Sequence, residues 1–90
     1  MLTPTTNDAE ALALAAMAAT LSDERRAQRF LDLTGLDVGE LRDRAMAGDR
    51  SLLGATIAFL ESHEPDLVAV AEVIGASPAQ LIAARGVLEA

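Results

Sequence analysis

Apolar side chains recur along this chain at the spacing of α-helices. The clearest stripe is formed by Leu53, Ile57 and Leu60, which lie at positions i, i+4 and i+7 and have Phe59 beside them. β-branched residues are too sparse to support a sheet. The pattern therefore predicts an all-α fold, a compact orthogonal bundle of about six short helices.

Capping residues, glycines and prolines divide the chain into these helices. Asn7, Asp8 and Glu10 have the pattern of a capping-box start, which places the first helix after a disordered tail of residues 1–6. Residues 7–90 are expected to form a single helical domain. The predicted helices cover about residues 7–21, 23–34, 38–47, 50–62, 65–74 and 78–90.

One stop-and-start pattern occurs twice, in residues 33–41 and again 40 positions later in residues 73–81. In each copy an apolar helix ends at a glycine, Gly35 or Gly75, that can adopt the left-handed conformation. An apolar residue follows, and an Asp or Ser then begins a capping box that a Glu or Gln completes. Two helix-turn-helix corners are therefore expected, with a possible three-plus-three pseudo-repeat. Duplication and convergence on common capping chemistry both stay open as its origin.

The expected core combines the apolar faces of these helices and includes both aromatic residues of the chain. In a domain this small, the loss of one large buried side chain would remove a large part of the stability. The predicted core residues are Phe30, Leu33, Leu53, Ile57, Phe59, Leu60, Leu67, Val70, Ile74 and Leu81.

The chain carries seven arginines, no lysine and fourteen acidic residues, which gives a net charge of −7. This charge opposes direct affinity for nucleic acid or for an anionic membrane surface. The absence of cysteine excludes a disulfide framework and a thiolate site. The uncharged run of residues 11–22 is too short to span a bilayer, and no cation precedes it as in an export signal. We therefore expect a cytoplasmic protein that binds neither nucleic acid nor membrane.

Catalytic constellations are missing from the sequence. It lacks a Gly-x-Ser-x-Gly elbow, a phosphate-binding glycine loop, any cysteine and a second histidine. The single histidine, His63, lies among carboxylates, but a position at the end of a helix explains it better than metal binding. We expect no enzymatic activity, no cofactor and no metal.

The second corner has the spacing of a DNA-binding helix-turn-helix motif, with Ala71 four positions before Gly75. The helix that would read DNA offers Gln80 and Arg85 as its polar side chains and little else. Residues 51–90 contain one arginine and five acidic residues, a net charge of +1 − 5 = −4. The corner is therefore interpreted as structural, and a degenerate helix-turn-helix DNA-binding protein is the alternative function.

The candidate surface for a partner lies on the first predicted helix, which has no charged residue from Ala11 to Leu21. A bundle of short, alanine-rich helices cannot easily cover such a helix on every side. The predicted apolar contact consists of Leu14, Met17 and Leu21.

The only local cationic cluster follows on the next helix and consists of Arg25, Arg26 and Arg29. Its functional interpretation is a docking point for an acidic partner at the rim of the apolar contact. The alternative is a solvated helix face that pairs partly with Asp32. The preferred function is a non-catalytic protein interaction or regulatory module. Its partner would be an unidentified protein or a second copy, and a monomer and a homodimer both stay open.

The chain as a whole resembles a family of short bacterial proteins known as domain of unknown function three-five-seven-two. The centre of the resemblance is Arg-Phe-Leu-Asp-Leu-Thr-Gly-Leu in residues 29–36, and further matching segments are residues 8–14, 41–42, 58–60 and 75–78. The resemblance implies a small helical protein of high-GC bacteria. It brings no activity and no site residues.

Overall fold

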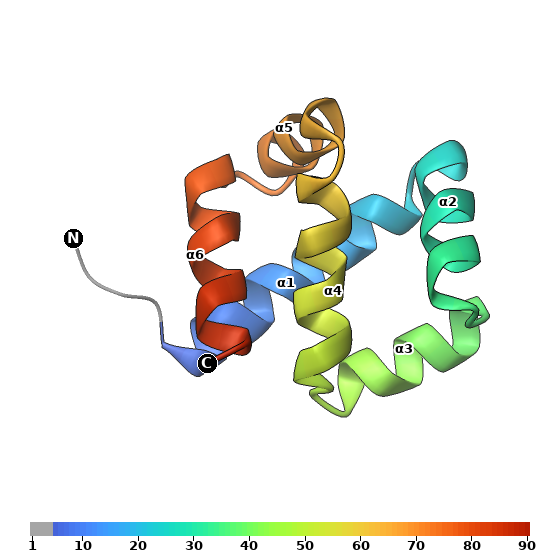
Figure 1. Ribbon diagram of the computed structural model, residues 1–90, viewed down its shortest axis with the longest axis horizontal. Helices are drawn as coiled ribbons and strands as arrows, with labels where there is room; N and C mark the ends of the chain where they lie inside the picture. The colour runs from blue at the N-terminus through green and yellow to red at the C-terminus, as the bar shows by residue number, and fades with distance from the viewer. Residues whose placement is uncertain (1–4) are drawn as a thin grey trace.

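Six helices and no strand make up residues 5–90, the part of the chain that the computed structural model describes (Figure 1). The all-α prediction is therefore confirmed. Within this range no single helix is long and apolar enough to cross a membrane, and α5 and α6 reach that length only as a pair bent by 97°. The helices are α1 (Thr6–Leu21), α2 (Glu24–Thr34), α3 (Val38–Met46), α4 (Arg50–Glu61), α5 (Glu64–Val73) and α6 (Pro78–Leu88).

Helix α1 begins earlier than the sequence pattern suggested. The Thr5 hydroxyl accepts a hydrogen bond from the Asp8 backbone N–H at 3.1 Å, and the Asp8 carboxylate accepts one from the Thr5 N–H at 3.3 Å. This reciprocal capping box lies two positions before the predicted one at Asn7, so that prediction of the helix start was wrong. Of the predicted tail, residues 1–4 lie outside the described part of the chain, while Thr5 and Thr6 belong to the cap and first turn of α1.

Both predicted corners are present. Gly35 and Gly75 have φ values of +70° and +71°, which are left-handed conformations that favour glycine. Asp37 and Ser77 then cap α3 and α6, and in each case the side chain three positions later completes the box. Each corner joins the second and third helices of a group of three, α1–α3 or α4–α6, as the predicted three-plus-three arrangement requires.

The two halves of the chain keep the same register beyond the corners. Helix α2 begins at Glu24 and α5 at Glu64, and the first residues of α3 and α6 are separated by the same 40 positions. The turn before α2 and the turn before α5 also share a serine cap. The Ser22 hydroxyl donates to the carbonyl three residues earlier at 2.7 Å, and the Ser62 hydroxyl does so at 2.6 Å. The two halves therefore repeat the positions of their helix caps and turns, although their helices differ in length.

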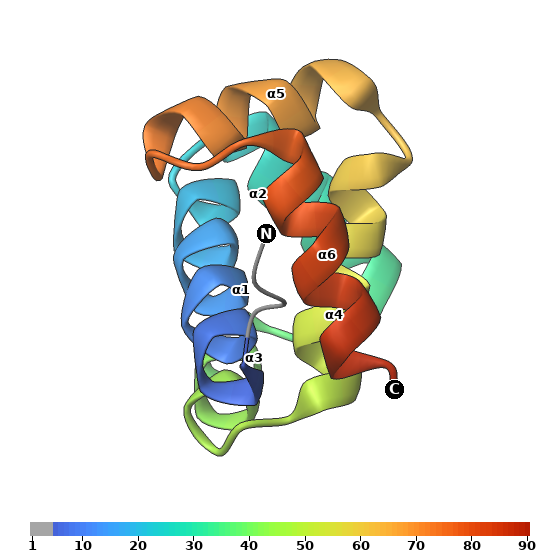
Figure 2. The ribbon, with the colours of Figure 1, turned by 90° about the vertical axis from the view of Figure 1, so that its left-hand side faces the viewer.

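Helices α1, α4 and α6 form the centre of the molecule, and α5 lies across one end of it (Figures 1 and 2). Helices α2 and α3 extend away from α6 on the other side of α4 (Figure 1). The central packing is close because α1 contributes mostly small side chains to it. The buried apolar residues of α1 are Ala9, Ala13, Ala16, Met17 and Ala19.

Most of the predicted core is buried, and one member is not. Phe59 and Ile74 are half-buried against the core, whereas Leu33 is 67% exposed and its assignment to the core was wrong. Phe30 is the only fully buried residue of α2, and the last turn of this peripheral helix is left open. The other predicted members are buried: Phe30, Leu53, Ile57, Leu60, Leu67, Val70 and Leu81.

Two threonines lie within the core without unpaired polar atoms. The Thr20 hydroxyl donates to the Ala16 carbonyl at 2.7 Å, and the Thr56 hydroxyl donates to the Leu52 carbonyl at 2.9 Å. Both bonds run back along the residue's own helix by four positions, which satisfies the hydroxyl locally. These two hydroxyls therefore do not form a buried reactive site.

Candidate functional site

An apolar groove of about 430 Å³ lies between α1 and α3. In Figure 2, α1 runs up the left-hand side and α3 lies behind its lower part. Its deepest side chains are Met17, which is 3% exposed, and Ala45. Half-buried leucines of α1 form one wall, and the exposed Met46 and Arg42 of α3 form the other. The residues that line the groove are Leu14, Met17, Ala18, Leu21, Ser22, Arg42, Ala45 and Met46.

The two walls are regular helical stripes. On α1 the lining residues fall at positions 14, 17, 18 and 21, and on α3 they fall at positions 42, 45 and 46. These spacings of three, four and seven place each set on one face of its helix. Residues of these two helices thus border one groove, and no third helix of the described chain contributes to its lining.

The predicted partner contact of Leu14, Met17 and Leu21 falls within this groove. The three residues do not play the same part, however. Met17 is buried in the core, whereas Leu14 and Leu21 are half-buried and border the opening. Sequence reasoning missed Met46, which is 76% exposed in the last turn of α3. Its large apolar side chain, next to the buried Ala45 in the last turn of a short helix, was the signal that could have identified it.

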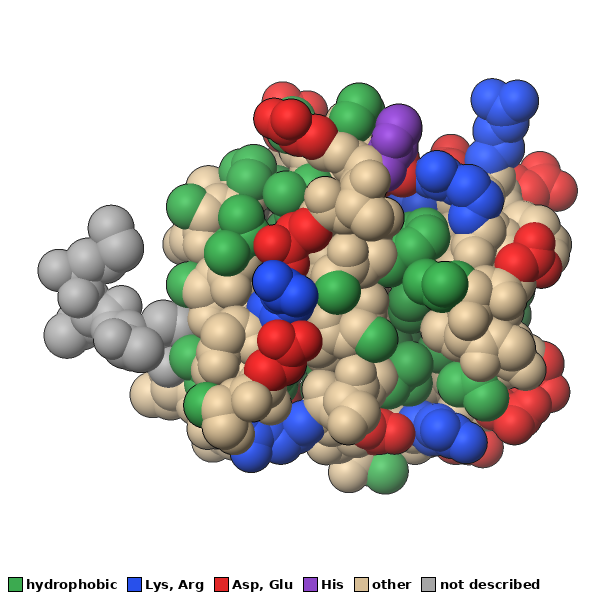
Figure 3. Space-filling model, in the orientation of Figure 1, with side chains coloured by type: hydrophobic (Ala, Val, Ile, Leu, Met, Phe, Trp, Pro, Cys, Tyr) green, Lys and Arg blue, Asp and Glu red, His purple; other side chains and the backbone are tan. Residues whose placement is uncertain are grey.

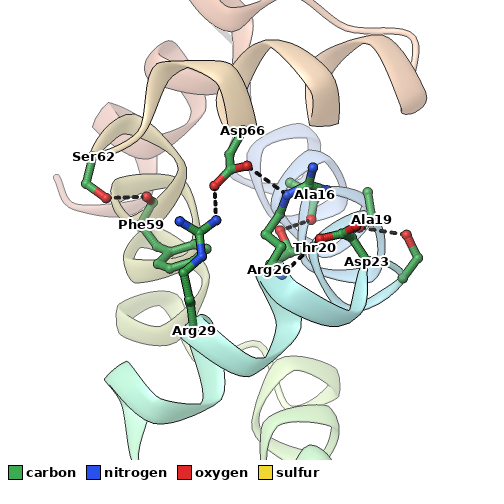
Figure 4. A network of polar contacts seen from close by, with 10 residues as sticks. Ala16, Ala19, Thr20, Asp23, Arg26, Arg29, Phe59, Ser62 and Asp66 are labelled. Carbon is green, nitrogen blue, oxygen red and sulfur yellow. Dashed lines mark hydrogen bonds and ion pairs between the residues drawn. The ribbon is translucent and has the colours of Figure 1, made fainter.

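Two of the three arginines of the predicted cluster, Arg26 and Arg29, pair with Asp66 (Figure 4). Arg26 Nε lies 3.2 Å from Asp66 Oδ1, and an Arg29 guanidinium nitrogen donates to Asp66 Oδ2. The predicted partner, Asp32, instead accepts a hydrogen bond from Gln28, so that assignment was wrong. The pairing joins the first turn of α5 to the first two turns of α2 (Figure 4). Two of the three arginines therefore hold the fold together.

Aromatic packing reinforces the same contact. The rings of Phe30 and Phe59 have their centroids 5.0 Å apart and are tilted by 52°, a favourable offset arrangement. The Arg29 guanidinium carbon lies 5.7 Å from the centroid of the Phe59 ring, within the range of a cation–π contact. Arg29 thus connects α2 to both α4 and α5.

Asp66 is the acidic centre of this network. Its burial would raise the pKa of its carboxyl, but hydrogen bonds from Arg29 and Arg26, together with their positive charges, hold the pKa below its ordinary value of 3.8. The carboxylate is therefore ionised at neutral pH. Such a group is a poor general acid, and its role here is to pair with two guanidinium groups.

A polar hollow of about 590 Å³ lies beside this network. The exposed Arg25 and His63 border it, together with side chains that already have partners within the chain. No group of three His, Asp or Glu side chains in residues 5–90 is placed to hold a metal ion. The hollow is lined by Asp23, Arg25, Gln28, Arg29, His63 and Asp66.

The second corner has the bend of a helix-turn-helix unit but not its usual charge. Helices α5 and α6 bend by 97°, and Val70 and Leu81 are fully buried at the corner. Arg85, the only cation of residues 51–90, has its Nε 2.7 Å from Glu61 Oε2, in an ion pair without the alignment of a hydrogen bond. On the face seen in Figure 3, basic side chains gather at the upper right, in the region of α2, and the others lie beside acidic ones.

Comparison with curated proteins and with solved structures gives no match. The sequence profile of one family, described as Protein of unknown function (DUF3572), matches residues 6–90. The match covers all six helices and both corners, and it agrees with the resemblance found in residues 29–36. The chain therefore belongs to the family described as Protein of unknown function (DUF3572).

Proposed function

We propose that this protein is a non-catalytic protein-interaction module of the cytoplasm, and that the groove between α1 and α3 is its binding site. The observation that carries this proposal is that one helical stripe of α1 and one of α3 border an open, mainly apolar groove. Exposed apolar surface with a polar rim is typical of protein–protein contacts.

The chemistry of the groove supports binding rather than catalysis. Its polar side chains are the Ser22 hydroxyl and the Arg42 guanidinium. The Ser22 hydroxyl already donates to the Ala19 carbonyl at 2.7 Å, and no general base lines the groove. A nucleophile without a neighbouring base is weak, so these residues do not form a catalytic set.

Met46 supplies the energetic argument. Burial of a methionine side chain that is otherwise in water contributes about 2 kcal/mol to association. Met46 is 76% exposed, and its flexible thioether can adapt to the shape of a partner. Two half-buried leucines on the opposite wall would lose their remaining exposure in the same contact.

A photo-crosslinking amino acid tests the proposal inside cells of the organism that encodes the chain. The substitution Met46→p-benzoylphenylalanine places the reactive group on the rim of the groove. Val73→p-benzoylphenylalanine is the matched control, because Val73 is 72% exposed but lies on α5, outside the groove. After irradiation, adducts are separated by size and identified by mass spectrometry.

We expect discrete protein adducts from position 46 and none of the same mass from position 73. An adduct with another protein and an adduct with a second copy both satisfy the proposal. The absence of any adduct at position 46, or the same adducts from both positions, would reject it.

A further inference from the structure

We propose that the occupant of the α1–α3 groove is an amphipathic helix of another protein, which places an acidic side chain opposite Arg42. This inference rests on the function proposed above and names the chemistry of the partner. It is carried by the shape of the groove, by the size of its floor residues and by the charge on its rim.

The shape fits a helix. The stripe on α1 runs from Leu14 to Leu21, which corresponds to about 10 Å of helix, or two turns. Ala18 and Ala45 are small, so a third helix can approach both walls at the usual interaxial distance of about 8–10 Å. An apolar stripe at positions i, i+3 or i+4, and i+7 of the partner would then occupy the groove.

The charge selects the partner further. Arg42 is the only charged residue that lines the groove, and within residues 5–90 it has no ion-pair partner. Complementary charge at the rim of an interface favours an Asp or Glu opposite Arg42 and disfavours a basic side chain there.

Two other occupants fit less well. A small molecule needs several convergent polar groups and enclosure, but this groove is open and has one hydroxyl and one guanidinium. A second copy that docks groove to groove would place each Arg42 against the same set of lining residues in the other copy, because an isologous contact uses one patch on both subunits. No acidic residue lines the groove to pair with Arg42 there.

The test combines the crosslinker at position 46 with charge changes on α3. Arg42→Glu reverses the charge at the rim, and Arg42→Lys keeps it. Arg44→Glu is the matched control, because Arg44 is also an exposed arginine of α3 but does not line the groove. Each doubly substituted chain is expressed at equal level, and the adduct is quantified and its crosslinked peptide sequenced. Purified protein at micromolar concentration is irradiated in parallel.

We expect the crosslinked peptide to come from another protein and to form an apolar helical stripe with an Asp or Glu on its border. Arg42→Glu should reduce the adduct about fivefold or more, since attraction becomes repulsion, while Arg42→Lys and Arg44→Glu should keep most of it. Three results would overturn the inference but leave the proposed function intact. These are an adduct equally insensitive to all three changes, a crosslinked peptide without an acidic residue, and an adduct of the purified chain with itself as the main product. If the chain with the crosslinker at position 46 and an unchanged Arg42 forms no adduct at all, the proposed function is rejected instead.

Discussion

Arg26 and Asp66 occupy equivalent positions in the two halves of the chain and pair with each other, with 3.2 Å between Nε and Oδ1. They are 40 positions apart, and each is the third residue of its helix, α2 or α5. The side chains of both are largely buried, with 14% of Arg26 and 12% of Asp66 exposed. The ion pair therefore connects the two halves of the chain at equivalent positions, and both of its side chains are largely shielded from solvent.

Asp66→Asn should destabilise the fold because it leaves Arg26 and Arg29 without their counter-charge. Removing one partner of a largely buried ion pair leaves the other desolvated and unpaired, and we expect a loss of about 1–3 kcal/mol in the free energy of unfolding. Denaturant unfolding at pH 7 measures it. Asp43→Asn on the exposed face of α3 serves as the control and should change stability by less than about 0.5 kcal/mol.

The same pair gives a defined pH dependence. The folded-state pKa of Asp66 lies below its ordinary value because of the two arginines, despite the opposing effect of burial. The resulting stability is fully present above the ordinary, unfolded-state pKa of 3.8 and is lost as the pH falls through the lower folded value. The stability difference between the natural chain and Asp66→Asn should therefore be constant above about pH 5 and shrink towards pH 3. A difference that stays constant down to pH 3 would contradict the assigned pairing.

Gly35→Ala and Gly75→Ala should each lower the free energy of unfolding by about 1–2 kcal/mol. The cost is conformational, since a β-carbon at either position meets no atom within 4 Å but would occupy a left-handed backbone. Gly86→Ala is the internal comparison. Gly86 lies inside α6, where a β-carbon also meets no atom within 4 Å, and alanine should stabilise the helix by about 0.5–1 kcal/mol. The corner assignment fails if all three substitutions have the same sign.

Local signals in the sequence predicted local structure well. The conformations of Gly35 and Gly75 and the caps at Asp37 and Ser77 depend on residues within about four positions, so the sequence pattern contains all the relevant information. The start of α1 was misplaced because two overlapping segments could each form a capping box, and the one with Thr5 forms.

Tertiary relationships were harder to predict from the sequence. The pairing of Arg26 with Asp66 spans 40 positions, whereas the predicted partner Asp32 was merely close in sequence. Leu33 has the right residue type for a core but lies in an uncovered last turn. The α1 side of the groove was predicted because this helix has no charged residue in that stretch. The α3 side depends on how the two helices pack together, and the periodicity of apolar residues gives no information about that packing.

Phe30→Ala should lower the free energy of unfolding by about 3–5 kcal/mol, enough to unfold much of a domain of this size. Phe30 is fully buried, and its ring packs against Phe59 at 5.0 Å. Leu33→Ala on the same helix should change stability by no more than about 0.5 kcal/mol, because Leu33 is 67% exposed. Thermal unfolding followed by circular dichroism compares the two variants. Equal losses would mean that the last turn of α2 is covered in solution.

Duplex DNA should bind weakly or not at all. The charge of residues 51–90 is −4 from one arginine and five acidic residues, and the one arginine is paired with Glu61. Phosphate contacts supply most of the affinity for DNA, and here they would be replaced by repulsion. Fluorescence anisotropy with labelled random-sequence duplex at about 150 mM salt measures the affinity. Sub-micromolar binding would restore the helix-turn-helix alternative.

The two methionines of the groove should separate folding from binding. Met17→Ala removes a buried side chain and should cost about 2–3 kcal/mol in the free energy of unfolding. Met46→Glu changes an exposed side chain and should leave stability within about 0.5 kcal/mol.

For the binding measurement, the photo-crosslinker is moved to Ala18, an exposed residue of the groove, so that position 46 can be varied. Met46→Glu should then reduce the partner adduct several-fold, because it places a charge in an apolar contact opposite an acidic helix. Val73→Glu introduces the same charge at a comparably exposed position on α5 and should leave the adduct unchanged. If both variants reduce the adduct equally, net charge rather than the groove governs the contact, and the binding site lies elsewhere.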